Sequence, residues 1–113
     1  LTGEDGLAYE YNKRGGEGCI SVTANIAPKM CSDMQKFSKS QDKDEQIKAE
    51  EIDKILQPVH KSLFIESNPS PVKYAAKLIG LCDDSVRLPL VTVLDQTKVE
   101  VKKALLSAKL INE

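Results

Sequence analysis

Two carboxylates follow a glycine near the start of the chain, at Gly3, Glu4 and Asp5. Paired carboxylates are a residue pattern that can carry general acid–base chemistry. Two acidic residues in a short polar segment are also typical of a loop that points into water. From the residues alone, the solvated loop is the favoured interpretation.

The only histidine, His60, limits the other catalytic chemistries that the chain could carry. One histidine with no recognisable nucleophile and acid around it predicts neither a Ser–His–Asp nor a Cys–His set. Without a second histidine or clustered cysteines, no metal-ligand set is predicted either. We expect His60 at a surface or half-buried position on a helix.

The three cysteines, Cys19, Cys31 and Cys82, are odd in number and widely spaced. This pattern indicates reduced thiols in the cytosol rather than a disulfide framework, and Cys19 is expected to act as a small buried apolar residue. The glycine cluster at 15–18 lacks the Lys-Ser/Thr pair of a phosphate-binding loop. It is better explained as a turn.

Composition bounds the remaining possibilities. The chain has 113 residues, a net charge of −1 and 4% aromatic residues, which predicts a single domain with an aliphatic core. The charge is balanced, so no nucleic-acid partner is expected. No apolar run is long enough for a membrane span and no signal peptide is visible, so we expect a cytoplasmic protein without a membrane partner. The first residue is Leu1, which fits a fragment or a processed product.

Only two segments read as strands. Leu1–Gly3 is a possible strand stub, and Cys19–Thr23 is rich in β-formers and bounded by Gly18. Residues 7–14 between them predict a short helix that ends at the glycine turn. Two strands cannot make a barrel or a sheet enzyme, so the chain is expected to be part of something larger.

The rest of the chain predicts about four helices. Their starts are placed at Pro28, at about Asp44, at Ser70 as an N-cap before Pro71, and at Asp95 as a cap. Pro58 lies inside the second apolar stripe and should kink or split that helix. Gly80 should end the third. Residues 87–90 are expected to be extended, and residues 91–94 have the propensity of a strand.

Three motifs resemble one family. Residues 15–28 read GGxGxISVTANxAP, residues 63–75 read LFxExNPxPVKxA, and residues 80–90 read GLxxxxxRLPL. Together, and in this order, they resemble the dihydrodipicolinate synthase (4-hydroxy-tetrahydrodipicolinate synthase) family, and the match is collinear over essentially all of the chain.

The resemblance implies an α/β fold, with a (β/α)₈ TIM barrel followed by a helical extension. A complete barrel needs about 250 residues, so the chain would be its C-terminal part and would itself be mostly α. Residues 1–40 would supply strand seven, helix seven, strand eight and helix eight. Residues 41–113 would form the helical extension.

The resemblance also implies a lyase of lysine and diaminopimelate biosynthesis. Such enzymes join pyruvate to aspartate semialdehyde through a Schiff base on a lysine, use no cofactor, and are expected to be cytoplasmic homotetramers. The family's lysine and relay tyrosine match nothing in this chain, so no catalytic residue is predicted and the isolated fragment should be inactive. Lys29 is expected to be solvated and Lys73 to be structural.

The resemblance assigns one substrate contact, the backbone carbonyl of Ile20, which would face pyruvate. The alternative is that Ile20 only fills the barrel interior. Gly3, Glu4 and Asp5 would form part of the pocket wall, with Glu4 where the family has aspartate. Further departures from the family pattern are Asn12, Arg14, Ser70, Val93 and Lys109.

Two rival functions remain open at this stage. One is a related pyruvate-dependent aldolase, such as an N-acetylneuraminate lyase or a keto-deoxy sugar-acid aldolase, which would differ in pocket residues outside this chain. The other is a non-catalytic helical module used for binding or assembly. A soluble, monomeric product that melts cooperatively would favour the module, and exposed apolar helix faces would favour the fragment.

Overall fold

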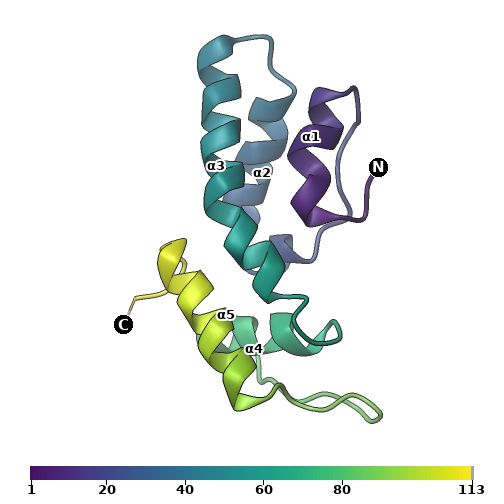
Figure 1. Cartoon of the computed structure of the whole chain (residues 1–113), viewed down its shortest axis with the longest axis vertical. Coiled ribbons are helices and arrows are strands. Elements are labelled where there is room, and N and C mark those ends of the chain that lie inside the picture. The colour runs from purple at the N-terminus through teal and green to yellow at the C-terminus, as the bar shows by residue number, and fades with distance from the viewer. Residues whose placement is uncertain (113) are drawn as a thin grey trace.

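The computed structural model describes residues 1–112, which form an elongated helical molecule of 44 × 30 × 21 Å (Figure 1). In chain order, its elements are the 3₁₀ turn η1 (Asp5–Leu7), α1 (Ala8–Lys13), the 3₁₀ turn η2 (Thr23–Asn25), α2 (Pro28–Ser38), α3 (Lys43–Ser62), α4 (Ser70–Leu78) and α5 (Asp95–Ser107). The expected dominance of helix is confirmed.

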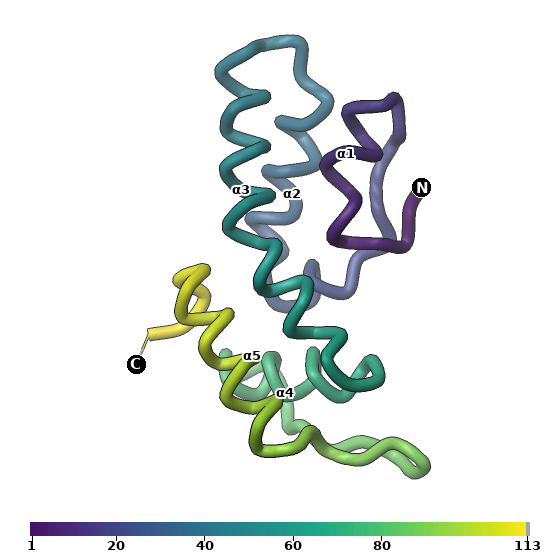
Figure 2. The backbone as a smooth tube through the Cα atoms, in the orientation of Figure 1, coloured from purple at the N-terminus to yellow at the C-terminus, as the bar shows by residue number. Residues whose placement is uncertain are grey.

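The long helix α3 joins the two ends of the molecule. Its first half lies antiparallel to α2, with α1 on the other side of α2, and its last turns contact α5, which packs on α4 (Figure 2). The largest core cluster lies at this second end and contains five fully buried residues: Val59, Leu63, Ala75, Val101 and Leu105. A smaller cluster between α1, α2 and α3 holds Ala8, Tyr9, Met34 and Ala49.

Local sequence explains where α2 and α3 begin. Pro28 occupies the first turn of α2, where its missing N–H costs no hydrogen bond. Asp42 caps α3 by accepting a hydrogen bond from the Asp44 N–H at 3.0 Å. Pro58 does not split α3, which is one helix from Lys43 to Ser62. The lost hydrogen bond is offset by burial of Leu56 and Val59 on either side.

The two expected strands are reduced to one parallel bridge between Thr2 and Cys19. The Thr2 N–H donates to the Gly18 carbonyl at 3.0 Å, and the Ile20 N–H donates to the Thr2 carbonyl at 2.9 Å. No strand forms within residues 1–112, and Thr23 begins a 3₁₀ turn instead. Each stub pairs with the other on one side only and, within the described residues, has no strand on its other side. Strands of a parallel sheet usually pair on both sides, so the pairing here does not extend beyond one bridge.

The sequence also mispredicted the connection between α4 and α5. Residues 87–90 form a turn, closed by a hydrogen bond from the Leu90 N–H to the Arg87 carbonyl, and residues 91–94 are irregular rather than a strand. Ser70 begins α4 but does not cap it, because its hydroxyl donates to the Val91 carbonyl at 2.9 Å. The predicted cap at Asp95 is wrong too, since α5 begins there without a side-chain cap.

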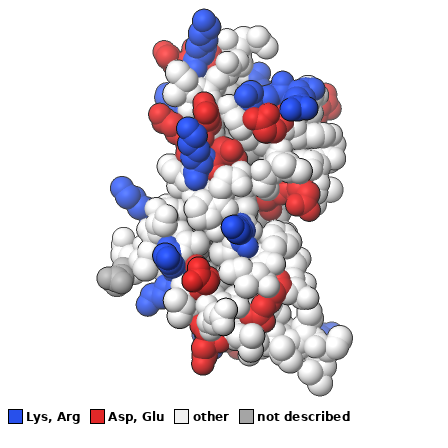
Figure 3. Space-filling view, viewed as in Figure 1, with Lys and Arg blue, Asp and Glu red and all other residues white. Residues whose placement is uncertain are grey.

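The surface carries both signs of charge. Acidic and basic side chains are interspersed over the face shown in Figure 3. None of the helices within residues 1–112 is both long and apolar enough to cross a lipid bilayer.

Candidate functional site

The Thr2–Cys19 bridge brings together the loops that carry the predicted site residues. Because the bridge is parallel, the chain leaves Thr2 and Cys19 in the same direction. Residues 3–6, the first loop, and residues 20–25, the second loop, therefore lie at the same end of the bridged pair. In a barrel of alternating strands and helices, chemistry takes place at this end of the strands.

Asp5 fastens the two loops to each other. Its side chain is only 6% exposed and accepts hydrogen bonds from the Ser21 hydroxyl, from the Val22 N–H at 2.8 Å and from the Thr23 N–H at 3.2 Å. The solvated-loop interpretation is therefore wrong for Asp5. It holds for Glu4, whose side chain is exposed. A buried carboxylate that accepts backbone N–H groups fixes the loop that donates them.

His60 reaches the second loop from α3. The expectation of a surface or half-buried position is wrong, because the ring is 5% exposed and its Nδ1 lies 2.7 Å from the Thr23 Oγ1. Which of the two atoms donates depends on the tautomer of the ring, and the other ring nitrogen, Nε2, is buried without a partner among the described residues. Burial lowers the pKa of His60, although the charges of Asp5 and Asp53 oppose this shift.

A second residue of α3 holds the first loop. The Gln57 Nε2 donates to the Gly6 carbonyl at 2.9 Å and to the Asp53 Oδ1 at the same distance. Gln57 and His60 are three residues apart, so both point from one face of the helix. Helix α3 therefore contacts both loops.

The backbone carbonyl of Ile20, the predicted substrate contact, accepts no hydrogen bond from any residue in the described part of the chain. The Ile20 side chain is 71% exposed, so within this chain it does not fill an interior. Gly3 is exposed beside it. The structure thus brings Gly3, Glu4, Asp5 and Ile20 to one end of the bridge, with the Ile20 carbonyl free to accept a donor.

Two hollows meet at this place, and Asp5 and His60 line both. One, of about 240 Å³, is lined by Cys19, Cys31 and Met34 among others. The other, of about 820 Å³, lies between the first loop and α3 and includes Gln57.

The thiols in the smaller hollow are not reactive groups. Burial, followed by the charge of Asp5, raises the pKa of Cys19 to about 11, and burial does the same for Cys31. Both stay protonated near neutral pH, and a thiol is a poor nucleophile. Cys19 is only partly buried, less than the sequence suggested, and its Sγ lies 3.9 Å from the Asp5 Oδ1.

Neither lysine considered as a nucleophile lies in a desolvated pocket. The Lys29 side chain is 86% exposed and pairs with Asp33 at 3.0 Å, as its predicted solvated role requires. Lys73 donates to the Ser85 carbonyl and ties α4 to the following loop, so its predicted structural role is confirmed. Within residues 1–112, no three His, Cys, Asp or Glu side chains are grouped to hold a metal ion.

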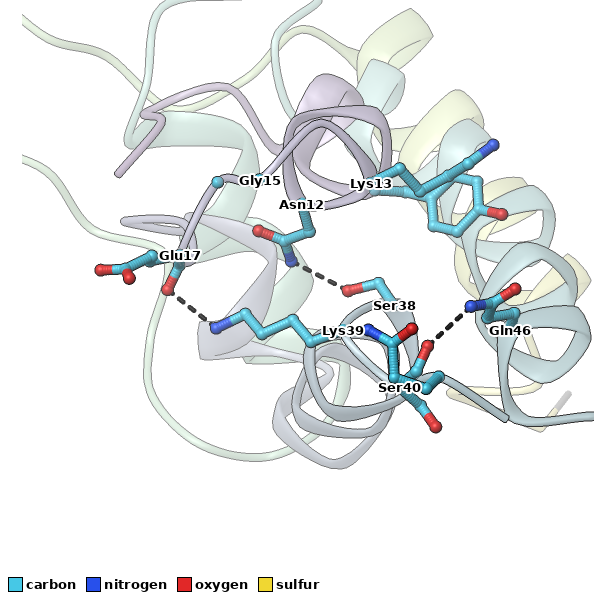
Figure 4. A pocket seen from close by; sticks show the side chains of 11 residues that line it. Asn12, Lys13, Gly15, Glu17, Ser38, Lys39, Ser40 and Gln46 are labelled. Carbon is cyan, nitrogen blue, oxygen red and sulfur yellow. Dashed lines mark hydrogen bonds between the residues drawn. The ribbon is translucent and has the colours of Figure 1, made fainter. Parts of the chain in front are cut away.

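A separate pocket of about 730 Å³ lies between α1 and the connection from α2 to α3 (Figure 4). Asn12 donates from α1 to the Ser38 Oγ at 2.9 Å, and Lys39 donates to the Glu17 carbonyl at 2.9 Å. The Asn12 amide nitrogen, which also donates to the Gln35 Oε1 at 2.7 Å, is thus paired at a position where the resemblance calls for an apolar residue, while its carbonyl oxygen is buried without a partner among the described residues. The pocket contains none of the predicted site residues.

Comparison with known proteins identifies the family of the chain. The profile of the Dihydrodipicolinate synthetase family matches residues 1–108. The chain belongs to this family. It is 67% identical over 111 residues to a 4-hydroxy-tetrahydrodipicolinate synthase of Pelagibacter ubique (strain HTCC1062), covering 98% of this chain but only 38% of that relative.

Solved dihydrodipicolinate synthases share the fold of the chain. The enzyme of Thermotoga maritima matches with a TM-score of 0.90 at 34% identity, over 96% of this chain and 36% of its own. A chloride-inhibited enzyme of Acinetobacter baumannii, complexed with pyruvate, matches with a TM-score of 0.88 at 41% identity, over 96% and 36%. The chain thus spans less than two-fifths of the family members it matches.

Sequence reasoning missed the contribution of α3 to the site. Position 60 follows Leu56 by four residues and precedes Leu63 by three, so it falls on the buried stripe of the helix. That spacing could have identified His60 as buried. Nothing in the sequence indicated that its partner would be Thr23.

Proposed function

We propose that residues 1–113 are the C-terminal part of a 4-hydroxy-tetrahydrodipicolinate synthase. In this proposal, residues 1–40 supply the last two strand–helix units of a (β/α)₈ barrel and residues 41–113 supply the helical extension. The observation that carries the proposal is the parallel Thr2–Cys19 bridge, with α1 between its two stubs and α2 after the second. A strand–helix–strand–helix order with parallel stubs is the repeating unit of such a barrel.

The parent enzyme would be a cytoplasmic homotetramer of lysine and diaminopimelate biosynthesis. A lysine amine elsewhere in the barrel would attack the pyruvate ketone and release water to form a Schiff base, and the enamine carbon derived from it would then attack the aldehyde of aspartate semialdehyde. The solved Acinetobacter baumannii relative is complexed with pyruvate. In our chain, the Ile20 carbonyl would accept a hydrogen bond in the pyruvate pocket, and Gly3, Glu4 and Asp5 would form part of its wall.

Residues 1–113 alone are expected to have no lyase activity. Neither Lys29 nor Lys73 has the desolvated surroundings that a Schiff-base lysine needs. The two strand stubs also have open edges, and exposed apolar side chains such as Leu1, Leu7 and Ile20 lie on or near them. The missing strands of a barrel would cover this surface.

The test is a chimera in which residues 1–113 replace the matching segment of the Pelagibacter ubique synthase. We expect the chimera to form a borohydride-trapped adduct with pyruvate and to turn over pyruvate and aspartate semialdehyde. The unmodified relative serves as the reference, and the 113-residue chain alone should trap no pyruvate. A folded chimera without either activity, or an adduct on the isolated chain, would overturn the proposal.

A further inference from the structure

Helix α3 touches both pocket loops through side chains on one of its faces. The Gln57 Nε2 donates to the Gly6 carbonyl, and the His60 Nδ1 is hydrogen-bonded to the Thr23 hydroxyl at 2.7 Å. Both residues lie in the last two turns of α3, where the helix is anchored in the main core by Val59. A rigid, well-packed helix is a suitable support for loops that must hold a substrate.

The bond to His60 completes a set of restraints on the peptide that carries the predicted substrate contact. On one side, the Ile20 N–H is held by the Thr2 carbonyl at 2.9 Å. On the other, the N–H groups of Val22 and Thr23 are held by Asp5. The Asp5 carboxylate belongs to the other pocket loop, so it joins the loops to each other and not to the rest of the molecule. The bond from Thr23 to α3 ties the second loop to the helix, beside the packing of Val22 and Ile26 on the main core.

We propose that His60, with Gln57, is a positioning residue that fixes the two loops for pyruvate binding. This inference rests on the function proposed above, and it gives the helical extension an indirect part in binding substrate. His60 touches no substrate and acts through Thr23.

Burial determines which of the two bonds matters more. Thr23 is fully buried and His60 nearly so, so the polar atom left without its partner when the other is removed carries a desolvation cost. The bond from Gln57 to the Gly6 carbonyl is exposed to solvent, and water can substitute for it at little cost. The effect of removing Gln57 should therefore be smaller than that of removing His60.

The kinetic test uses the active chimera. We expect His60→Leu and Thr23→Val each to raise the KM for pyruvate about tenfold, which corresponds to about 1.4 kcal/mol of binding, while the KM for aspartate semialdehyde changes less than about twofold. His60→Asn keeps an acceptor near the position of Nδ1, and Thr23→Ser keeps the hydroxyl. Both conservative variants should stay within about threefold of the parent KM.

Ser62→Ala is the matched control, since Ser62 is a buried polar residue of the same helix whose hydroxyl bonds only to the Val59 carbonyl. It should leave the KM for pyruvate unchanged. The double variant of Thr23→Val and His60→Leu should be no worse than either single variant, because both remove the same bond. A purely structural lesion would instead lower the amount of active enzyme and leave KM as it was.

Failure of this inference can be separated from failure of the proposed function. An active parent chimera whose KM for pyruvate is the same in all four variants would overturn the positioning role alone. An inactive parent chimera would overturn the proposed function and this inference with it. On the 113-residue chain, the ¹⁵N resonance of the His60 Nδ1 should shift in Thr23→Val and stay in place in Ser62→Ala, and an unchanged resonance in Thr23→Val would contradict the bond.

Discussion

Replacing Lys109 with glycine is expected to stabilise the chain. Lys109 follows the last turn of α5 with a φ of 58°, in the left-handed region where a side chain is crowded. Two hydrogen bonds hold it there: its own N–H donates to the Leu106 carbonyl at 3.0 Å, and the Leu110 N–H donates to the Leu105 carbonyl at 2.9 Å. This pair of bonds is the Schellman end of a helix, whose left-handed position is usually glycine.

The same motif ends α4 with the favoured residue. There the left-handed position is Gly80, with a φ of 83°, and the Leu81 N–H donates to the Ala76 carbonyl at 2.9 Å. The chain therefore contains its own comparison, one helix end with glycine and one with lysine. A Cβ added at Gly80 would meet no atom within 4 Å, so its cost would come from the backbone alone.

The size of the effect follows from two opposing terms. A left-handed conformation costs a residue with a side chain about 1–2 kcal/mol. Glycine also makes the unfolded chain more flexible, which reduces this gain by about 0.4–1 kcal/mol. The net stabilisation should be about 0.5–1 kcal/mol. With an unfolding entropy of about 2.1 cal/mol/K per residue, this is a rise in Tm of about 2–4 °C for a chain of 113 residues.

Thermal and urea unfolding followed by far-UV circular dichroism would measure this change. Lys109→Ala keeps the Cβ and should leave Tm nearly unchanged, whereas Gly80→Ala should lower Tm by about as much as Lys109→Gly raises it. If Lys109→Gly and Lys109→Ala gave the same Tm, the left-handed backbone would not be the source of strain and the argument would fail.

Three other outcomes follow from the site. Asp5→Ala should lower the free energy of unfolding by about 2–3 kcal/mol, because it leaves buried N–H groups unpaired. Glu4→Ala should change this free energy little, and the urea midpoints of the two variants would test the difference. Because burial lowers the pKa of folded His60, the unfolded chain takes up the proton first, so stability should fall as the pH drops below about 6.5, by at most about 1.4 kcal/mol per pH unit from this group. His60→Asn should remove that component from the pH dependence of the urea midpoint, and an identical dependence in both proteins would contradict the shift. In a thiol titration with Ellman's reagent near neutral pH, only the exposed Cys82 should react rapidly, because burial shields Cys19 and Cys31 and raises the pKa of each to about 11; a second fast thiol would refute this.

Much of the helical framework could be predicted from local sequence. Apolar spacing and turn chemistry placed the start of each of the five α-helices to within about two residues, because these signals are read over a few neighbouring positions, but they missed the two 3₁₀ turns. Pro28 at the start of α2 and Gly80 after α4 acted as their backbone geometry requires. Several errors fall where the outcome depends on a distant partner. Ser70 could not be assigned correctly because its hydroxyl bonds to Val91, 21 residues away.

The sequence by itself determined the family, the positions of the helices and the residues that approach the proposed pocket, because these depend on residue types and spacing along the chain. Tertiary structure alone decided that Asp5 is a buried link between two loops, that His60 is buried and hydrogen-bonded to Thr23, and that the strand stubs pair at a single bridge. Burial and long-range hydrogen bonds arise only when segments far apart in the chain are packed together.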